Sequence, residues 1–138
     1  MSTNLQILSP LIAAKISAIS GIHAVYEYEP DKPESGKYPF ATVTPSEFNG
    51  EFADTMRNFR NYIFNVRIYQ ERTEAGFGNQ KAERIIREIC DDAISAFDDD
   101  TQLGGAVLWI RPVKANLNYD DRETGDTRVA EIVVEVHT

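Results

Sequence analysis

The sequence is poor in the residues that build redox, disulfide and catalytic sites, with one cysteine, two histidines and one tryptophan in 138 residues. A single cysteine cannot form an internal disulfide, so a reducing compartment is expected. No apolar run approaches the length of a membrane span, and the N-terminus lacks the basic-then-apolar pattern of a signal peptide. These absences predict a protein with no membrane partner.

Positive charge is also scarce, because 14 Lys and Arg residues stand against 22 Asp and Glu residues, for a net charge of −8. Duplex binding that depends on neutralising phosphates is therefore not expected. A protein of this charge that meets DNA is expected to let it pass without specific binding. The length and the 42% hydrophobic content fit one globular domain over residues 1–138.

The patterns of an enzyme are missing as well. His23 lies in a predicted strand and His137 is the penultimate residue, and neither has a nucleophile beside it in the pattern. Cys90 falls on the apolar stripe of a predicted helix, which indicates a small core residue. Gly76 and Gly78 lie between a strand and a helix, but the third glycine of a dinucleotide fingerprint and the Gly-Lys-Ser/Thr of a P-loop are absent. We therefore predict no enzyme and no cofactor.

Two acidic clusters could be read as metal sites. The segment "NYDDRETGD" supplies several carboxylates, but neither the ligand spacing nor the final bidentate Glu of a calcium loop is present. A solvated hairpin tip is the favoured interpretation, with a structural calcium site as the alternative. Asp98, Asp99 and Asp100 are interpreted in the same way, so no metal site is predicted.

The first half of the chain predicts one helix and three strands. Apolar residues recur at helical spacing at Leu5, Leu8, Ile12, Ile16 and Ile19. Pro10 leaves two alternatives: Ser9 caps a helix that begins at Pro10, or an earlier turn continues through a kink at Pro10. The helix should reach Ile19 in either case and end at Ser20-Gly21.

Strands are predicted at residues 22–28, 38–44 and 60–69. Pro39 suggests an edge position or a bulge in the second of these, and Pro45 should end it. Alternation in the third strand places Tyr62, Phe64, Val66 and Ile68 on one side.

The second half predicts a helix at residues 80–97, followed by two strands. The apolar stripe of the helix consists of Ala82, Ile85, Ile86, Ile89, Ala93 and Phe97. Asn79 is the expected N-cap, and Glu83 with Arg87 forms an i,i+4 pair. Strands are expected at residues 106–115 and 128–137, on either side of a polar tip at 116–127. The last strand should face the core with Ala130, Ile132, Val134 and Val136.

The predicted order is therefore α-β-β-β-α-β-β. Short connections between successive strands favour antiparallel pairing, and helices would cover the apolar face of such a sheet. The fold class predicted is α+β, a mainly antiparallel sheet of about five strands packed with two helices.

The chain resembles the tail-terminator, or tail-completion, proteins of long-tailed bacteriophages. The segments that carry this resemblance are "GIHAVYEYEPD", "YPFATVTP" and "EFADTMRNFRNYIFNVRIYQ", followed by an amphipathic helix and a C-terminal hairpin. In that family an acidic residue and Asp-Thr, then Asn and Arg, lead into a strand of aromatic and β-branched residues. The resemblance covers nearly the full length and includes no catalytic signature.

The resemblance implies a homo-oligomeric ring, a hexamer, on the head-proximal end of the tail tube. Such a ring stops tube polymerisation and meets the head connector or head-completion protein, so the implied location is the head–tail junction of the virion, after assembly in the host cytoplasm. The polar approach at residues 51–61 would be a projecting arm or extended strand at a subunit boundary. Its candidate interface residues are Glu51, Asp54, Thr55, Arg57, Asn58 and Arg60. Candidate acidic residues of a DNA lumen are Asp98, Asp99, Asp100, Asp120, Asp121 and Glu123.

Other interpretations remain open at this stage. Within a virion, another head–tail adaptor or a minor tail component would share these features. Outside it, the chain could be an oligomeric α+β binding module, or a small hydrolase with an unrecognised site. The bland interpretation of residues 51–61 is a flexible surface loop.

Overall fold

The computed structural model describes residues 5–28, 39–52, 58–71, 79–120 and 127–138. Its elements are, in chain order, α1 (Leu5–Ser17), β1 (Ala24–Tyr26), β2 (Phe40–Phe52), β3 (Asn58–Glu71), α2 (Asn79–Asp99), the 3-10 turn η1 (Leu103–Gly105), β4 (Trp109–Asp120) and β5 (Thr127–His137). This order confirms the predicted α+β class.

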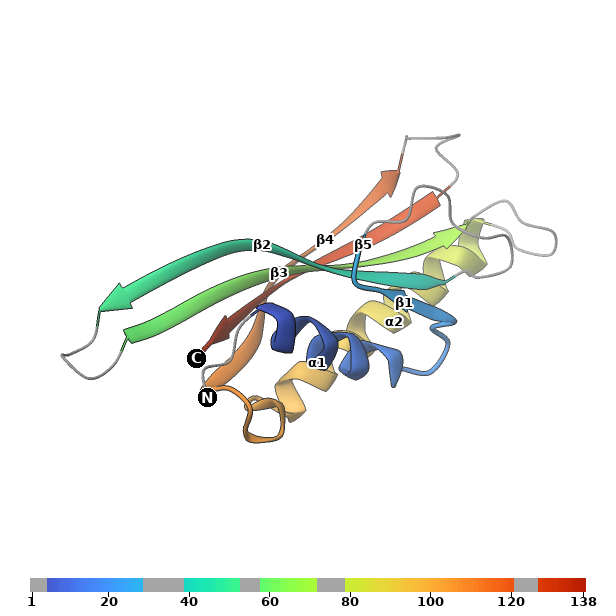
Figure 1. The fold of residues 1–138 in the computed structure, drawn as a ribbon. Helices are drawn as coiled ribbons and strands as arrows, with labels where there is room; N and C mark the ends of the chain where they lie inside the picture. Colours follow the sequence, from blue (N-terminus) through green and yellow to red (C-terminus); the bar gives the residue numbers. More distant parts are fainter. Residues whose placement is uncertain (1–4, 29–38, 53–57, 72–78, 121–126) are drawn as a thin grey trace.

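The five strands form one sheet in the order β1-β2-β3-β5-β4, with both helices on the same face (Figure 1). β2, β3, β5 and β4 pair antiparallel, whereas β1 pairs parallel with β2. The prediction of antiparallel pairing is therefore wrong for β1. The long connection at residues 27–39 returns the chain to the end of the sheet where β1 starts, which a parallel neighbour requires.

β1 is also shorter than the predicted strand at 22–28, because only Ala24, Val25 and Tyr26 find partners on β2. Within the part of the chain that the structure describes, the rest of β2, from residue 43 onward, pairs on one side only, with β3.

The core lies between the helices and one face of the sheet, as the alternation predicted. Tyr62, Phe64, Val66 and Ile68 are buried on β3, and the four inward residues of β5 are fully buried. Ile86, Ile89, Ala93 and Phe97 cover them from α2. Burying apolar side chains of this size contributes roughly 1.5–3 kcal/mol each, which makes this layer the main source of stability.

Helix α1 continues through Pro10, so the second alternative for this helix holds and Ser9 is not its N-cap. Pro10 is exposed, so water can reach the carbonyl that its missing N–H leaves without a partner. The helix ends at Ser17, two residues before the predicted end at Ile19, although Ile19 is still buried. Gly21 follows with φ 97°, a backbone conformation that favours glycine.

The predicted end of β2 at Pro45 is wrong, since the strand runs on to Phe52. Pro45 pairs with Phe64, and the register shifts between Pro45 and Glu47. This bulge absorbs the proline, because an irregular rung does not need the missing N–H.

The predicted polar tip at residues 116–127 is wrong for residues 116–120 and for Thr127, which lie in strands, and residues 121–126 fall outside the described residues. β4 reaches Asp120 and β5 starts at Thr127, and these two residues pair with each other. The strand begins later than expected, at Trp109, because η1 and the turn after it occupy residues 103–108. Polarity misled the prediction here, since β4 is an edge strand whose outer residues can stay in water.

Helix α2 is longer than predicted, Asn79–Asp99 instead of 80–97. Asn79 is its first residue, and Asp98 and Asp99 lie in its last turn rather than beyond it. None of the helices in the described part of the chain combines the length and the apolar character needed to cross a membrane.

Candidate assembly surface

The distal part of the β2–β3 hairpin projects beyond the rest of the sheet (Figure 1). We call residues 47–52 of β2 and 58–61 of β3 the arm. Arg60 exchanges two backbone hydrogen bonds with Thr138, of 3.2 and 2.9 Å. Past this pair the two strands of the arm pair only with each other among the described strands, through Glu51 opposite Phe59 and Phe52 opposite Asn58. The arm is thus an extended strand pair, one of the two forms predicted for the polar approach.

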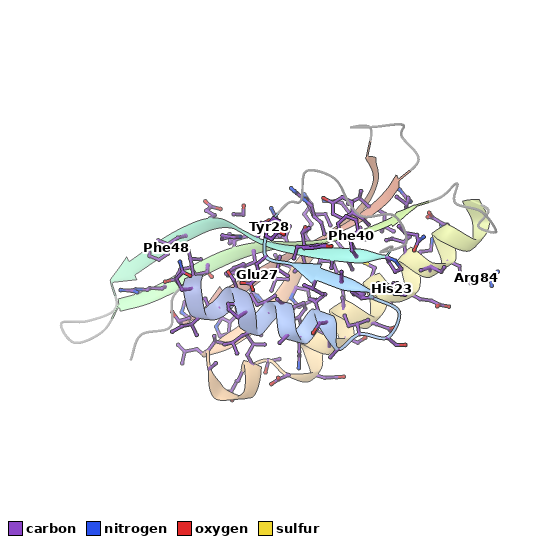
Figure 2. All side chains as sticks on the ribbon, turned by 45° about the vertical axis from the view of Figure 1, so that its right-hand side comes forward. His23, Glu27, Tyr28, Phe40, Phe48 and Arg84 are labelled. Atoms are coloured by element: carbon purple, nitrogen blue, oxygen red, sulfur yellow. The ribbon has the colours of Figure 1, made fainter. Side chains whose placement is uncertain are left out.

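A shallow apolar groove of about 520 Å³ lies where the arm meets α1. This arm-base groove is lined by Leu5, Gln6, Phe48, Arg60 and Tyr62. Phe48 is 51% exposed and Leu5 is 38% exposed, whereas Tyr62 is buried beneath them. Figure 2 shows Phe48 on β2 beside the start of α1.

Phe48 packs on the ring of Tyr62. The two ring centroids are 5.0 Å apart, at a tilt of 31°. An exposed aromatic ring fixed by its neighbours is the kind of side chain that anchors protein interfaces.

The face of the sheet without helices carries charged pairs across neighbouring strands. Arg67 donates to Glu131 at 2.7 Å between β3 and β5, and the Asn61 amide donates to Glu135 at 3.0 Å. Arg111 on β4 lies 3.9 Å from the Glu135 carboxylate. Such half-exposed pairs contribute little stability, typically about 0.2–1 kcal/mol each.

An aromatic stack stands at one end of the same face. The Trp109 and His137 rings are opposite each other on β4 and β5, with centroids 5.0 Å apart and planes at 5°. The Arg111 guanidinium carbon lies 4.7 Å from the Trp109 ring centroid, within cation–π range. Trp109 therefore takes part in the surface of this face.

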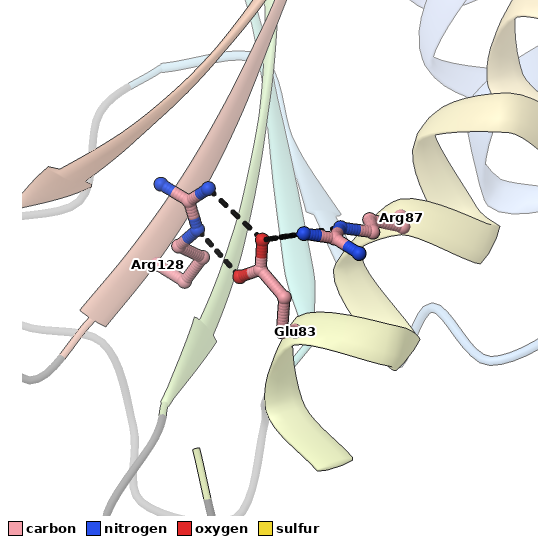
Figure 3. A network of polar contacts seen from close by, with 3 residues as sticks. All are labelled: Glu83, Arg87 and Arg128. Atoms are coloured by element: carbon pink, nitrogen blue, oxygen red, sulfur yellow. Dashed lines mark hydrogen bonds and ion pairs between the residues drawn. The ribbon is translucent and has the colours of Figure 1, made fainter. Parts of the chain in front are cut away.

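At the opposite end of the sheet a polar network joins α2 to β5 (Figure 3). Arg128 donates to both carboxylate oxygens of Glu83, at 2.7 and 3.0 Å. Arg87 reaches the same carboxylate at 3.1 Å, which confirms the predicted i,i+4 pair. The hydrogen bond from Arg128, aided by both positive charges, lowers the pKa of Glu83 against a smaller effect of burial. The Arg128 contact could not be predicted, because no local spacing links residues 45 apart.

The candidate acidic residues do not form one group. Asp98 and Asp99 are exposed at the end of α2, near the start of β4, where Ile110 N donates to Thr101 O at 2.7 Å. Asp120 is the last residue of β4, about 36 Å from Trp109 at the start of the strand, by the usual rise per residue. Asp121 and Glu123 lie outside the described residues.

Asp100 already has partners within the chain. Lys15 Nζ donates to its carboxylate at 2.9 Å, and Gly104 N donates at 3.0 Å. These two contacts lower the pKa of Asp100 below its ordinary value. The pair ties α1 to the loop after α2, so Asp100 has a structural contact that Asp98 and Asp99 lack among the described residues.

Of the candidate interface residues, Arg60 is the one whose side chain is seen to line a surface feature, the arm-base groove. Glu51 and Asn58 lie in the paired strands of the arm. Asp54, Thr55 and Arg57 fall outside the described residues. Phe48 was not among the candidates, because β2 was expected to end at Pro45, although the alternation of Phe48, Gly50 and Phe52 marks a strand face.

Chemistry-bearing side chains are dispersed in the described part of the chain. No group of three His, Cys, Asp or Glu residues there could hold a metal ion. Cys90 is buried against the core as predicted, and burial, with help from the Asp91 charge, raises the pKa of its thiol. A thiol with a raised pKa is a weak nucleophile at neutral pH.

No protein-family model and no curated protein sequence matches the chain. Solved structures do match its fold. A chain from the virion of a native gene transfer agent (GTA) particle superposes with a TM-score of 0.57 at 16% identity, over 94% of this chain and 92% of that chain. A second solved structure gives a TM-score of 0.50 at 13% identity, over 95% of this chain and 90% of that chain. At these identities the likeness shows a shared fold.

Proposed function

We propose that the chain is a structural subunit of a phage-type virion, which acts without catalysis by binding copies of itself and neighbouring virion proteins. The near-complete overlap in fold with a protein of a gene transfer agent virion supports this class. The motifs of residues 21–31, 38–45 and 51–70 support the finer assignment as a tail terminator. In that role six copies form a ring that caps the head-proximal end of the tail tube and joins it to the head connector.

The observation that carries the proposal is the arm. Its strands extend past the body of the domain, and its exposed Phe48 lies in an apolar groove that the described chain leaves open. An aromatic ring in such a groove gains free energy only when another molecule covers it, at roughly 25 cal/mol per Å² of apolar surface. A subunit boundary would provide that cover.

Net charge supports the proposed passage of DNA. At −8 the subunit repels phosphate, so a genome could move through a ring without sticking to it. Asp98 and Asp99 are the exposed candidates for a lumen surface, and Asp120 stands at the other end of β4. Asp121 and Glu123 remain candidates from the sequence. Reversing the charge of Asp98 and Asp99 should reduce DNA retention in assembled particles, and unchanged retention would count against this part of the proposal.

The main experiment shortens the arm. Residues 51–59 are replaced by Asn-Gly, a dipeptide that suits a two-residue hairpin between Gly50 and Arg60, which already pair. The variant should fold with unchanged circular dichroism but fail to form rings or cap tubes of the cognate tail tube protein in electron micrographs. The matched control replaces residues 121–126 by Asn-Gly between Asp120 and Thr127, and it should cap tubes like the wild type.

Rings that form and cap tubes despite the shortened arm would overturn the role of the arm. Wild-type protein that leaves tube ends bare and tube lengths unlimited would overturn the tail-terminator assignment. In that case the binding of wild-type protein to isolated head connectors, tested in the same micrographs, decides for a head–tail adaptor.

A further inference from the structure

The single sheet of this domain has two long edges that differ from each other. β4, Trp109–Asp120, forms one edge. At the other edge β1 pairs only with the first three residues of β2, so residues 43–52 of β2 have no second neighbour among the described strands. Both edges therefore present backbone N–H and C=O groups that can pair with another strand.

Strand directions make these two edges compatible. β2, β3, β5 and β4 alternate in direction across the sheet, so β4 runs opposite to β2. When a second copy is related to the first by rotation about an axis along the strands, its β2 lies antiparallel to β4 of the first. A heterologous contact of this kind repeats from copy to copy and closes into a ring.

Opposite charges stand at the two edges on the face without helices. Glu47 of β2 lies in one row of paired residues with Ile63, Glu135 and Arg111, so Glu47 and Arg111 share a face. Lys114 pairs with Val133 in a neighbouring row of the same face. Glu47 and Lys114 are both exposed, and neither has an ion pair among the described residues.

Exposed apolar side chains stand at the same two edges on the helix-covered face. Phe48, opposite Tyr62, is 51% exposed at the β2 edge. Leu117, in the row of Ala130 and Ile68, is 37% exposed at the β4 edge. A sheet that continues from one copy to the next keeps its faces, so the Glu47 carboxylate would meet the cations of β4 on the face without helices. In that register Phe48 lies in the row of Val136, away from Leu117 in the row of Ala130, so the charged residues alone specify the junction.

We propose that β4 of one copy pairs antiparallel with residues 43–52 of β2 in the next copy, which makes one continuous sheet around the assembly. If β4 of one copy paired with β4 of another, Arg111 and Lys114 of both copies would face each other. This repulsion between like charges disfavours a two-fold dimer through β4. This inference rests on the proposed function, because the ring makes a second copy of the chain the partner of β4. It specifies which strands of neighbouring copies pair.

Two single charge reversals test the junction. Glu47→Lys sets a lysine at position 47 against the cations of β4, and Lys114→Glu sets a carboxylate at position 114 against Glu47, while Arg111 keeps its charge and its partner Glu135. Each variant alone should associate at least about tenfold more weakly than the wild type, as measured by light scattering and native mass spectrometry, because like charges then oppose each other across every junction.

An equimolar mixture of the two variants should recover assembly. Each junction between unlike copies then joins opposite charges, either the two introduced side chains or the native Glu47 of one variant and the native Lys114 of the other. Recovered rings should alternate the two variants and contain an even number of copies.

Controls come from the exposed face of α2. Arg84→Glu and Glu88→Lys change charge by the same amounts at exposed positions of α2, which forms neither edge of the sheet, and they should assemble like the wild type. Circular dichroism of all four variants checks folding. Single variants that assemble normally, or a mixture that assembles no better than its components, would overturn the inference.

If the free wild-type chain is monomeric, the same samples are compared for capping of tail tube ends. Capping by either single variant at the wild-type level then overturns the edge pairing while the proposed function stands. The reverse result is also possible: the mixture of variants recovers assembly, but wild-type rings do not bind tube ends. That result supports the edge pairing and overturns the tail-terminator assignment.

Discussion

The β2–β3 hairpin has two halves that follow the same alternation and end in different environments. In the half that includes Val43, Phe64 and Val66, the helix-side residues are fully buried. In the arm the same side of the strands carries Phe48, which is half exposed. The described part of α1 begins at Leu5, beside Phe48, so helical cover stops where the arm begins. Burial is decided by what packs on a strand, and the strand pattern only makes burial possible.

This difference implies that the two halves serve different states of the protein. The covered half stabilises the isolated subunit, and in the proposed assembly the arm would offer its apolar surface to a neighbouring molecule.

The largest effect expected is loss of a core ring, and it separates the two halves directly. Phe64→Ala should lower the free energy of unfolding by about 3–5 kcal/mol, because a fully buried aromatic leaves a cavity. Phe48→Ala loses mainly the ring contact with Tyr62, worth about 0.5–1.5 kcal/mol. Urea denaturation of the monomer measures both. Equal losses would mean that the arm is as much a part of the subunit core as the covered strands.

The covered half was predictable from sequence, and the reason is physical. Strict alternation predicted one buried face for β3 and for β5, and the helical stripe predicted one for α2. The structure buries these faces. Cys90 followed from the same stripe. These signals are local, since each depends on neighbours about two to four residues apart.

The rest depended on contacts that no local pattern contains. The parallel pairing of β1, the passage of β2 through Pro45 and the extent of β4 are set by distant partners such as Phe64 and Val133. At the arm, polar residues at 46–58 hid the strand, and Phe48 was overlooked although it marks the surface. The ion pair of Glu83 with Arg128 joins elements far apart in the chain.

The second prediction concerns what fixes the covered part of the sheet to α2. Arg128→Met removes a bidentate contact whose arginine side chain is only 12% exposed, and it should lower the free energy of unfolding by about 1.5–3 kcal/mol. Arg87 contacts the same carboxylate from an exposed position, so Arg87→Met should lower the free energy of unfolding by only about 0.3–0.5 kcal/mol. A double-mutant cycle with Glu83→Gln isolates the Arg128 term, and a coupling near zero would contradict it.

A related prediction uses pH in place of substitution. The folded-state pKa of Glu83 is lowered, so its stabilising contribution is complete above the unfolded-state pKa and is lost as pH falls through the folded-state value. The wild type should therefore lose its advantage over Glu83→Gln on acidification. Urea denaturation of both proteins from neutral to strongly acidic pH measures this. A difference that stays constant over the whole range would show that Glu83 acts without its charge.

The smallest effect expected is a difference in how fast cysteines react with a disulfide reagent. It compares a covered position with one on the arm. Cys90 is buried on the core side of α2 and its thiol pKa is raised, so it should react with a disulfide reagent only after unfolding. A cysteine placed on the arm by Phe48→Cys, in a Cys90→Ala background, should react at once in the monomer. In assemblies its reaction should slow at least about tenfold, because a neighbouring copy covers the groove. If the arm cysteine reacts equally fast in monomer and assembly, the arm lies outside the subunit contact, and its exposed ring needs another partner.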